Sequence, residues 1–366
     1  MRKTDQLAAA LTAYGAQSAY GAASAPGATR VVGLQRITDG WEAEVYAVRL
    51  ADHEPADVVL RVYPSHDGAE RCAREFAVLK LVSAAGYPVP RPYFHETAAE
   101  PLGHPFLVMQ RLAGGPLGDA LARAEPAVRA SLESAFYALL VALHALDRRG
   151  FEPLLRPGVP AEAEAIAQAG HTQTAAKLRA MAAGDYLPVL AWLVERAATV
   201  DWGALALCHL DYHPNNVLVD AAGRLGVIDW GGAEVADPRM DLGWLVLMAE
   251  CYDPSGREAV LAGYERAGGG SLRHMEYFEV VASLRRLAEI TGMLKVGPVA
   301  CGKRPGAERL LREDTAAIRH AYERLVALTG RRVPEAERTL RILDRVPWRT
   351  RVRQGLRTAY HTLRQH

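Results

Sequence analysis

Apolar residues in the first third of the chain alternate with polar ones or form short β-branched runs, a pattern typical of antiparallel strands. Strands are predicted at residues 31–34, 44–50, 58–63 and 106–109. Between the third and fourth strands the spacing becomes helical and predicts a helix of about 18 residues, over 67–85. The predicted apolar face of this helix consists of Cys72, Phe76, Leu79 and Val82.

The remainder of the chain reads as mostly helical. A long helix that ends near Asp147 is predicted from a stripe of apolar positions, namely Val128, Leu132, Phe136, Leu139 and Leu143. The interval 205–230 stands apart, because two short β runs flank the turn at residues 220–223. A sheet-rich first third followed by helices predicts an α+β fold with two unequal lobes, and argues against a doubly wound parallel sheet.

Four parts are therefore expected along the chain. An Ala-rich N-terminal helical extension occupies residues 1–29, with its helix over 3–24. A lobe made of the sheet and one helix follows at 30–109, and a Gly-Gly-Pro hinge region at 110–116. The helical lobe then takes up residues 117–366.

Composition and charge narrow the class of protein. The 366 residues carry a formal net charge of +1, so that neither nucleic acid nor a membrane surface is an expected partner. We expect no membrane span, because no apolar run approaches the roughly 20 residues that a bilayer requires. The four cysteines form no Cys-x-x-Cys pair, and we expect reduced thiols in a cytoplasmic protein. The arginine-rich stretch 345–366 is interpreted as a solvated helical tail.

The segment after residue 207 carries the chemistry. It reads His209-Leu210-Asp211, then His-Pro-Asn-Asn ending at Asn216, and later Ile-Asp-Trp-Gly around Asp229. Phosphoryl transfer needs Mg²⁺ to neutralise the phosphates, and this ion prefers oxygen ligands. It also needs a separate carboxylate to accept or orient the proton of the attacking hydroxyl. One loop and one short hairpin supply these groups here, namely Asp211, Asn216 and Asp229. The alternative is that these residues only form turns, as single Asp and Asn residues usually do.

This run resembles the catalytic loop shared by eukaryotic-like protein kinases and the aminoglycoside phosphotransferase/choline kinase group. Three motifs favour the phosphotransferase branch: His-Pro-Asn-Asn, Ile-Asp-Trp and Asp-Pro-x-x-Asp, which ends at Asp241. No Ala-Pro-Glu or long activation loop follows, which argues against a protein kinase. The resemblance implies a two-lobed protein-kinase-like fold. It makes Asp211 the catalytic base, Asn216 and Asp229 the Mg²⁺ ligands, and His209 and Asp241 supports of the loop.

The first lobe is similar to the nucleotide-binding lobe of the same families. Residues 58–61 lie where kinases have Val-Ala-Ile-Lys, so that Val59 is expected to cover the adenine and Arg61 to meet the phosphates. Glu75 is the expected partner of Arg61. The alternative is that Arg61 is a surface charge on an edge strand.

The purine and its phosphates are expected to meet two further parts of the first lobe. Met109 and Arg111, at the start of the hinge, should reach the purine through backbone groups, which leaves ATP or GTP possible. Gly40 is the candidate for the phosphate-covering loop, although no Gly-x-Gly-x-x-Gly is present and an ordinary hairpin turn fits equally.

The expected function is Mg-ATP-dependent transfer of the γ-phosphate to a hydroxyl of a small molecule. An aminoglycoside-like antibiotic, an amino alcohol, a sugar and a related metabolite remain open as acceptors, and so does the oligomeric state. The stretch 248–252 and the helix 277–293, which carries Glu279 and Arg285, are candidate acceptor contacts. The alternatives are a nucleotide-binding pseudokinase that acts as a scaffold and a protein kinase.

Overall fold

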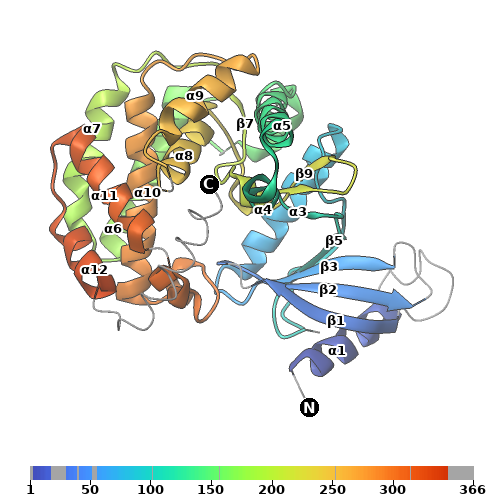
Figure 1. Cartoon of the computed structure of the whole chain (residues 1–366). Helices are drawn as coiled ribbons and strands as arrows, with labels where there is room; N and C mark the ends of the chain where they lie inside the picture. Colours follow the sequence, from blue (N-terminus) through green and yellow to red (C-terminus); the bar gives the residue numbers. More distant parts are fainter. Residues whose placement is uncertain are drawn as a thin grey trace. The chain divides into compact units, whose positions relative to one another are not determined.

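Antiparallel strand pairing organises the first third of the chain in the computed structural model (Figure 1). The structure describes residues 3–17, 30–38, 41–51, 56–100, 102–155, 157–251, 253–313 and 315–344. Gly40, residues 18–24 of the predicted N-terminal helix and the arginine-rich stretch 345–366 lie outside these ranges.

The chain divides into two compact units, each made of separate stretches. Unit 1 consists of Met1–Ala113, Gly226–Gly231 and Pro298–Ala307. Unit 2 consists of Gly114–Leu225, Gly232–Gly297 and Glu308–His366. The contiguous lobe boundaries expected above remain a prediction.

Unit 1 is built on a five-stranded sheet with the order β1-β2-β3-β5-β4. Its strands are β1 (Arg30–Thr38), β2 (Glu44–Ala51), β3 (Asp57–Val62), β4 (Pro92–Glu96) and β5 (Phe106–Gln110). All neighbouring pairs are antiparallel, and Val59 of β3 lies opposite Met109 of β5. The three predicted strands and the fourth at 106–109 are present, while β4 was not predicted.

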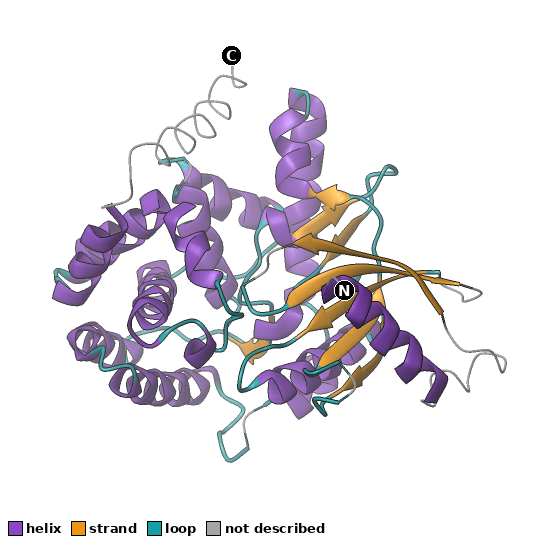
Figure 2. Ribbon diagram, turned by 90° about the horizontal axis from the view of Figure 1, so that it is seen from below, coloured by secondary structure: helices purple, strands orange, loops and turns teal. Residues whose placement is uncertain are grey.

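Alternation along β3 separates its side chains onto two faces of the sheet. Val58, Leu60 and Val62 belong to a core cluster that also contains Leu7 and Leu11 of helix α1 (Lys3–Gln17). Figures 1 and 2 show α1 lying across the strands. Burial of this apolar face is what holds α1 on the sheet, since removal of each such side chain from water contributes about 1.5–3 kcal/mol.

Helix α3 (Gly68–Ala84) follows β3, as the helical spacing predicts. Cys72, Leu79 and Val82 are buried, but Phe76 is only partly buried and stacks on His95, with ring centroids 4.2 Å apart. The expectation that Phe76 belongs to the buried stripe is therefore wrong in part. Glu75 takes a buried position instead.

Unit 2 consists mainly of helices. They are α4 (Leu117–Arg123), α5 (Pro126–His144), α6 (Ala163–Ala180), α7 (Leu187–Ala197), α8 (Arg239–Glu250), α9 (Gly256–Arg266), α10 (Met275–Val296), α11 (Thr315–Thr329) and α12 (Pro334–Asp344). Its short strands are β6 (Gly115–Pro116), β7 (Ala206–Cys208), β8 (Val217–Val219) and β10 (Glu234–Ala236), while β9 (Leu225–Val227) continues from unit 2 into unit 1. Helix α10 is buried along most of its length and packs against α7, α8, α11 and α12. The predicted class, an α+β fold with a small antiparallel-sheet lobe and a large helical lobe, is confirmed.

Helix α5 differs from its predicted apolar stripe. Phe136 and Leu143 are buried as expected, but Val128 is 54% exposed and Leu140 joins the buried face. By length and composition, this 19-residue helix is apolar enough to cross a membrane. Core helices pass the same test, so that one such helix is weak evidence of a span, and the expectation of no membrane span stays a prediction. Its buried face packs against α9 and β7 within unit 2.

The approach of α8 to α10 generates a stability prediction. A Cβ atom on Gly243 would lie 2.5 Å from the carbonyl oxygen of Phe278, which is backbone and cannot rotate away. We expect Gly243→Ala to lower the free energy of unfolding by about 2–4 kcal/mol, measured by denaturant unfolding. The matched control is Gly170→Ala in α6, where a Cβ meets nothing within 4 Å and helix propensity favours Ala. Equal stability of the two variants would contradict the close approach.

Candidate active site

The loop after β7 is tied to the first turn of helix α8 through one carboxylate. Asp241 is fully buried, and its Oδ1 accepts a hydrogen bond from the backbone N–H of Leu210 at 2.5 Å. Its Oδ2 accepts the backbone N–H of His209 at 2.9 Å. Leu210 has a φ of +60°, an unusual value for a residue with a branched side chain. The two bonds from Asp241 hold this unfavourable turn in place, directly before Asp211.

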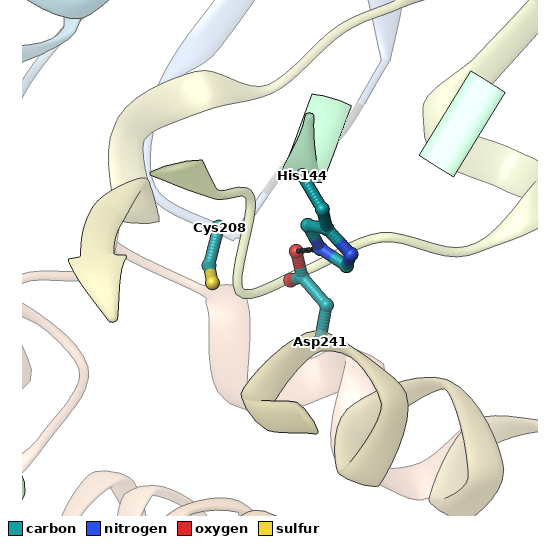
Figure 3. Close-up of side chains that lie close together, drawn as sticks. All are labelled: His144, Cys208 and Asp241. Carbon is teal, nitrogen blue, oxygen red and sulfur yellow. Dashed lines mark hydrogen bonds and ion pairs between the residues drawn. The ribbon is translucent and has the colours of Figure 1, made fainter. Parts of the chain in front are cut away.

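His144, at the end of α5, supports the same carboxylate. Its Nε2 lies 3.0 Å from Oδ2 of Asp241 (Figure 3). Its Nδ1 lies 2.9 Å from the hydroxyl of Tyr264. A carboxylate only accepts hydrogen bonds, so that Nε2 of His144 donates to Asp241. Burial raises the pKa of Tyr264, whose hydroxyl contacts Nδ1, to about 12.

Cys208 completes a group of three side chains that could hold a metal. The ligand atoms of His144, Cys208 and Asp241 lie within 4.8 Å of one another, as Figure 3 shows. Burial raises the pKa of the Cys208 thiol well above its usual value, whereas a metal needs the thiolate. Both oxygens of Asp241 already accept bonds from the loop backbone. We interpret the group as the support of the loop.

Asp211 lies on this loop with its carboxylate partly exposed, at 34%. Its backbone N–H donates to Nδ1 of the buried His209 at 3.2 Å. The amide nitrogen of Asn216 donates to both the carbonyl oxygen and the Oδ2 of Asp211, at 2.9 and 3.0 Å. Sequence neighbours on both sides therefore fix the direction of the Asp211 carboxylate.

A short turn places Asn216. The turn Pro214–Asn216 begins with a proline, whose fixed φ suits a helical start. His213 precedes it, and its Nδ1 accepts the backbone N–H of Asn215 at 3.3 Å. Nε2 of His213 lies 3.7 Å from Oδ1 of Asp211. His213 thus packs within the loop, as expected.

Arg285 of α10 holds the other side of the Leu210 peptide. Its Nη1 donates to the carbonyl oxygen of Leu210 at 2.6 Å, and its guanidinium lies 4.2 Å from the centroid of the Trp244 ring. Sequence reasoning suggested Arg285 as an acceptor contact, but not as a support of the loop. No local signal points to this role, because the two residues lie 75 positions apart.

The second aspartate belongs to unit 1. Asp229 has a φ of +69°, and its Oδ1 accepts a hydrogen bond from Nη2 of Arg61 at 2.9 Å. The turn around it is anchored, since Val227 N–H donates to the carbonyl of Pro88 at 2.8 Å and the Trp230 indole donates to Val227 at 2.9 Å. Anchoring of this kind maintains a backbone conformation that costs about 1–3 kcal/mol in isolation.

Arg61, Glu75 and Asp229 come together in unit 1. Nη2 of Arg61 lies 3.4 Å from Oε2 of Glu75, which also accepts the hydroxyl of Tyr63 at 2.7 Å. Arg61 is only 6% exposed and β3 lies inside the sheet, so that its interpretation as an edge-strand surface charge is wrong. Burial raises the pKa of Glu75 to about 7, although the positive charge of Arg61 lowers it.

Two buried polar atoms of this group lack a hydrogen-bond partner among the described residues. They are Nε of Arg61 and Oε1 of Glu75. Such atoms are rare in folded proteins and point to an unseen partner. A guanidinium N–H suits a phosphate oxygen, so that Arg61 fits a nucleotide phosphate.

The other residues predicted to contact the nucleotide differ in how far they are buried. Val59 and Met109 are both buried, lie opposite each other, and share the sheet face of Arg61. Arg111 is exposed just beyond the end of β5. Gly40 lies outside the described residues, so that its predicted place over the phosphates stays a prediction.

Glu279, a predicted acceptor contact, is buried in an ion-pair group. Glu279 is 1% exposed, and its oxygens accept Nε of Arg257 at 2.8 Å and Nε of Arg324 at 2.9 Å. These two arginines neutralise the charge of Glu279 between helices. Glu279 is therefore engaged within unit 2, and its role as an acceptor contact stays a prediction. Of the stretch 248–252, Tyr252 lies outside the described residues.

Comparison with known proteins places this geometry in a family. The model of the family described as "Phosphotransferase enzyme family" matches residues 33–279, which is more than half of the chain. A Ralstonia eutropha JMP134 protein assigned as an aminoglycoside phosphotransferase has a TM-score of 0.59 at 17% identity, covering 93% of this chain and 98% of that chain. Macrolide 2'-phosphotransferase MphH from Brachybacterium faecium has a TM-score of 0.51 at 20% identity, covering 88% and 98%. The GDP and kanamycin complex of APH(2")-IIia has a TM-score of 0.54 at 18% identity, covering 81% and 98%. At these identities the structures show a shared fold.

Curated relatives match smaller parts. The chain is 25% identical over 227 residues to acyl-CoA dehydrogenase family member 10 of Mus musculus, which is 58% of this chain and 20% of that protein. It is 38% identical over 68 residues to uncharacterized protein YcbJ of Bacillus subtilis strain 168, which is 18% of this chain and 21% of that protein. The chain thus spans about a fifth of the length of the curated relatives it matches.

The raised pKa of Glu75 predicts a pH dependence of stability. Between the ordinary pKa of 4.5 and about 7, folded Glu75 keeps a proton that the unfolded chain has lost. The free energy of unfolding should therefore fall by about 1–3 kcal/mol as the pH rises through this window. Glu75→Gln should lose this decline, whereas Glu70→Gln, an exposed position of α3, should keep it. Denaturant unfolding at pH 5, 6 and 7 measures the slope, and identical slopes in wild type and Glu75→Gln would contradict the prediction.

Proposed function

Because the chain belongs to the phosphotransferase enzyme family, we propose that it transfers the γ-phosphate of Mg-ATP to a hydroxyl of a small molecule. The observation that carries this proposal is the fixed, partly exposed carboxylate of Asp211, held through Asp241, His209 and Asn216. A carboxylate with these supports is suited to orient an acceptor hydroxyl and to accept its proton.

We assign the metal to Asn216 and Asp229. Both offer the hard oxygen ligands that Mg²⁺ prefers, and the amide nitrogen of Asn216 is engaged with Asp211, so that its oxygen is the atom for the metal. The ion would neutralise charge on the transferred phosphate. Asn216 lies in unit 2 and Asp229 in unit 1.

Arg61 is the proposed phosphate contact in unit 1. Glu75 and Asp229 balance its buried charge, while its Nε has no partner among the described residues. Val59 and Met109 offer an apolar surface on the same sheet face for the purine. Contacts through the backbone of the residues that follow, up to Arg111, leave ATP and GTP both possible, and one similar solved structure contains GDP.

The acceptor is proposed as a hydroxylated small molecule. Similar solved structures include a macrolide 2'-phosphotransferase and a kanamycin complex, which supports antibiotics as members of a test panel. Neutralisation of Glu279 removes one argument for a cationic acceptor. A pseudokinase scaffold is the second candidate, favoured by the Arg in place of Lys at position 61. The intact set of Asp211, Asn216 and Asp229 argues against it.

ADP release from Mg-ATP against a panel of hydroxylated acceptors tests the activity. The panel holds aminoglycosides, macrolides, amino alcohols, homoserine, ketosamines and sugars, with Asp211→Asn as the blank. We expect Asp211→Asn to lower turnover by about 10²–10⁴-fold with nearly unchanged nucleotide affinity, since only the proton acceptor is lost. Asp201→Asn, an exposed position of unit 2, is the control. Unchanged turnover in a folded Asp211→Asn protein would refute the assignment.

Nucleotide binding tests the metal ligand separately. We expect Asp229→Ala to abolish the gain in nucleotide affinity that Mg²⁺ gives, because a carboxylate ligand is lost. Calorimetric titration of ATP with and without Mg²⁺ measures this gain. The control is Asp220→Ala, whose side chain serves the hairpin turn and pairs with Arg224. A wild-type response to Mg²⁺ in Asp229→Ala would exclude Asp229 as the ligand.

A further inference from the structure

The segment Pro298–Ala307, here called the docking segment, follows α10 in sequence but belongs to unit 1. It contacts the residues directly after Gly40. The backbone N–H of Arg304 donates to the carbonyl of Trp41 at 2.9 Å, and Nζ of Lys303 donates to Oε1 of Glu42 at 2.8 Å. One backbone bond and one ion pair therefore hold two consecutive residues between β1 and β2.

The Lys303–Glu42 pair is largely shielded from water. Lys303 is 7% exposed, and a buried ammonium group requires an anionic partner to offset its lost hydration. Glu42 also contacts Nη1 of Arg71 at 3.0 Å, and Nε of Arg71 donates to Asp67 at 2.7 Å. Burial alone would raise the pKa of Glu42, but the charges of Lys303 and Arg71 outweigh it and hold the pKa at about 2. Glu42 is therefore ionised at any physiological pH.

A glycine permits the docking segment to approach this closely. Gly302 has a φ of +71°, and a Cβ atom there would lie 2.3 Å from the guanidinium of Arg71. The positive φ favours glycine, and any side chain at this position would require the Arg71 guanidinium to shift. Gly302 thus lies against Arg71, and the next residue, Lys303, pairs with Glu42, which Arg71 also contacts.

The same carboxylate lies beside the proposed nucleotide contacts. A Cβ atom on Gly231 would lie 3.4 Å from Oε2 of Glu42 and 3.5 Å from Oε2 of Glu75. Gly231 is two residues after Asp229, and Glu75 pairs with Arg61. Glu42, which pairs with Lys303 of the docking segment, therefore lies next to the Arg61–Glu75–Asp229 group within unit 1.

We propose that Lys303 is a positioning residue for nucleotide binding, which acts through Glu42 on the turn between β1 and β2. This inference rests on the proposed function, since it assigns that turn to the phosphates. A glycine-rich loop shapes itself around phosphate, whereas here Trp41 and Glu42 are held from outside by Arg304 and Lys303 of the docking segment. Fixing the turn before binding lowers the conformational entropy that the nucleotide must remove.

Titration of Mg-ADP without an acceptor tests the proposal. We expect Lys303→Met to raise the Kd of Mg-ADP by about 10-fold, since the turn loses its anchor. In turnover assays the KM for ATP should rise, with kcat and the KM for the acceptor nearly unchanged. Lys303→Arg should restore affinity, because it keeps the charge. Lys303→Met combined with Glu42→Gln should bind no more weakly than the weaker single variant, because both remove the same pair.

A second lysine–glutamate pair, in unit 2, supplies the control. Lys295 of α10 contacts Glu335 of α12, and its side chain is more exposed than that of Lys303, 33% against 9%. Lys295→Met should lower the melting temperature without changing nucleotide affinity. If Lys303→Met does not fold, Lys303→Gln, which keeps a donor for Glu42, is tested in its place and should still weaken binding.

Three outcomes are distinguishable. Weaker Mg-ADP binding in Lys303→Met and normal binding in Lys295→Met support the proposal. Wild-type affinity in a folded but less stable Lys303→Met protein overturns it and leaves Lys303 as a structural anchor only. Absence of Mg-ADP binding in the wild-type protein removes both this inference and the proposed function.

Discussion

The hydrogen bonds from the backbone of His209 and Leu210 to the buried carboxylate of Asp241 are the constraint on which the site depends. Two buried N–H groups need acceptors, and a loop at positive φ cannot offer them from its own secondary structure. Asp241 supplies both acceptors from α8, with His144 and Tyr264 behind it. The direction of Asp211 follows from this arrangement, because Asp211 is the next residue along the chain.

Unit 1 depends on a different interaction, the pairing of buried cations with carboxylates. Arg61 and Lys303 are cations with little exposure to water, and each faces a carboxylate, Glu75 and Glu42 respectively. Buried ion pairs contribute little net stability, because their desolvation offsets their attraction. Their concentration around Asp229 and Gly231 is therefore better explained by the binding of an anion than by stability. Among the described residues, Nε of Arg61 has no hydrogen-bond partner, which agrees with this explanation.

Several elements were predictable because their cause is local. The alternation of β2 and β3, the helical spacing of α3 and the hairpin after Asn216 each arise from neighbouring residues, and the structure contains all of them. The spacing of Asp211, Asn216 and Asp229 identified the candidate chemistry. Phe76 and Val128 were assigned to buried faces that they do not occupy fully, because periodicity states which residues share a face and not how far the partner surface extends.

The sequence by itself determined the class of fold, the candidate site motif and the family, since these depend on residue types at short spacing. Only the tertiary structure decided which distant residues complete the site. Arg285 reaches Leu210 across 75 positions, and Lys303 reaches Glu42 across 261. A charged residue in a linear pattern is read as exposed by default, because burial of a charge requires a partner that the pattern does not show. The fold supplies that partner, and with it the role of the residue.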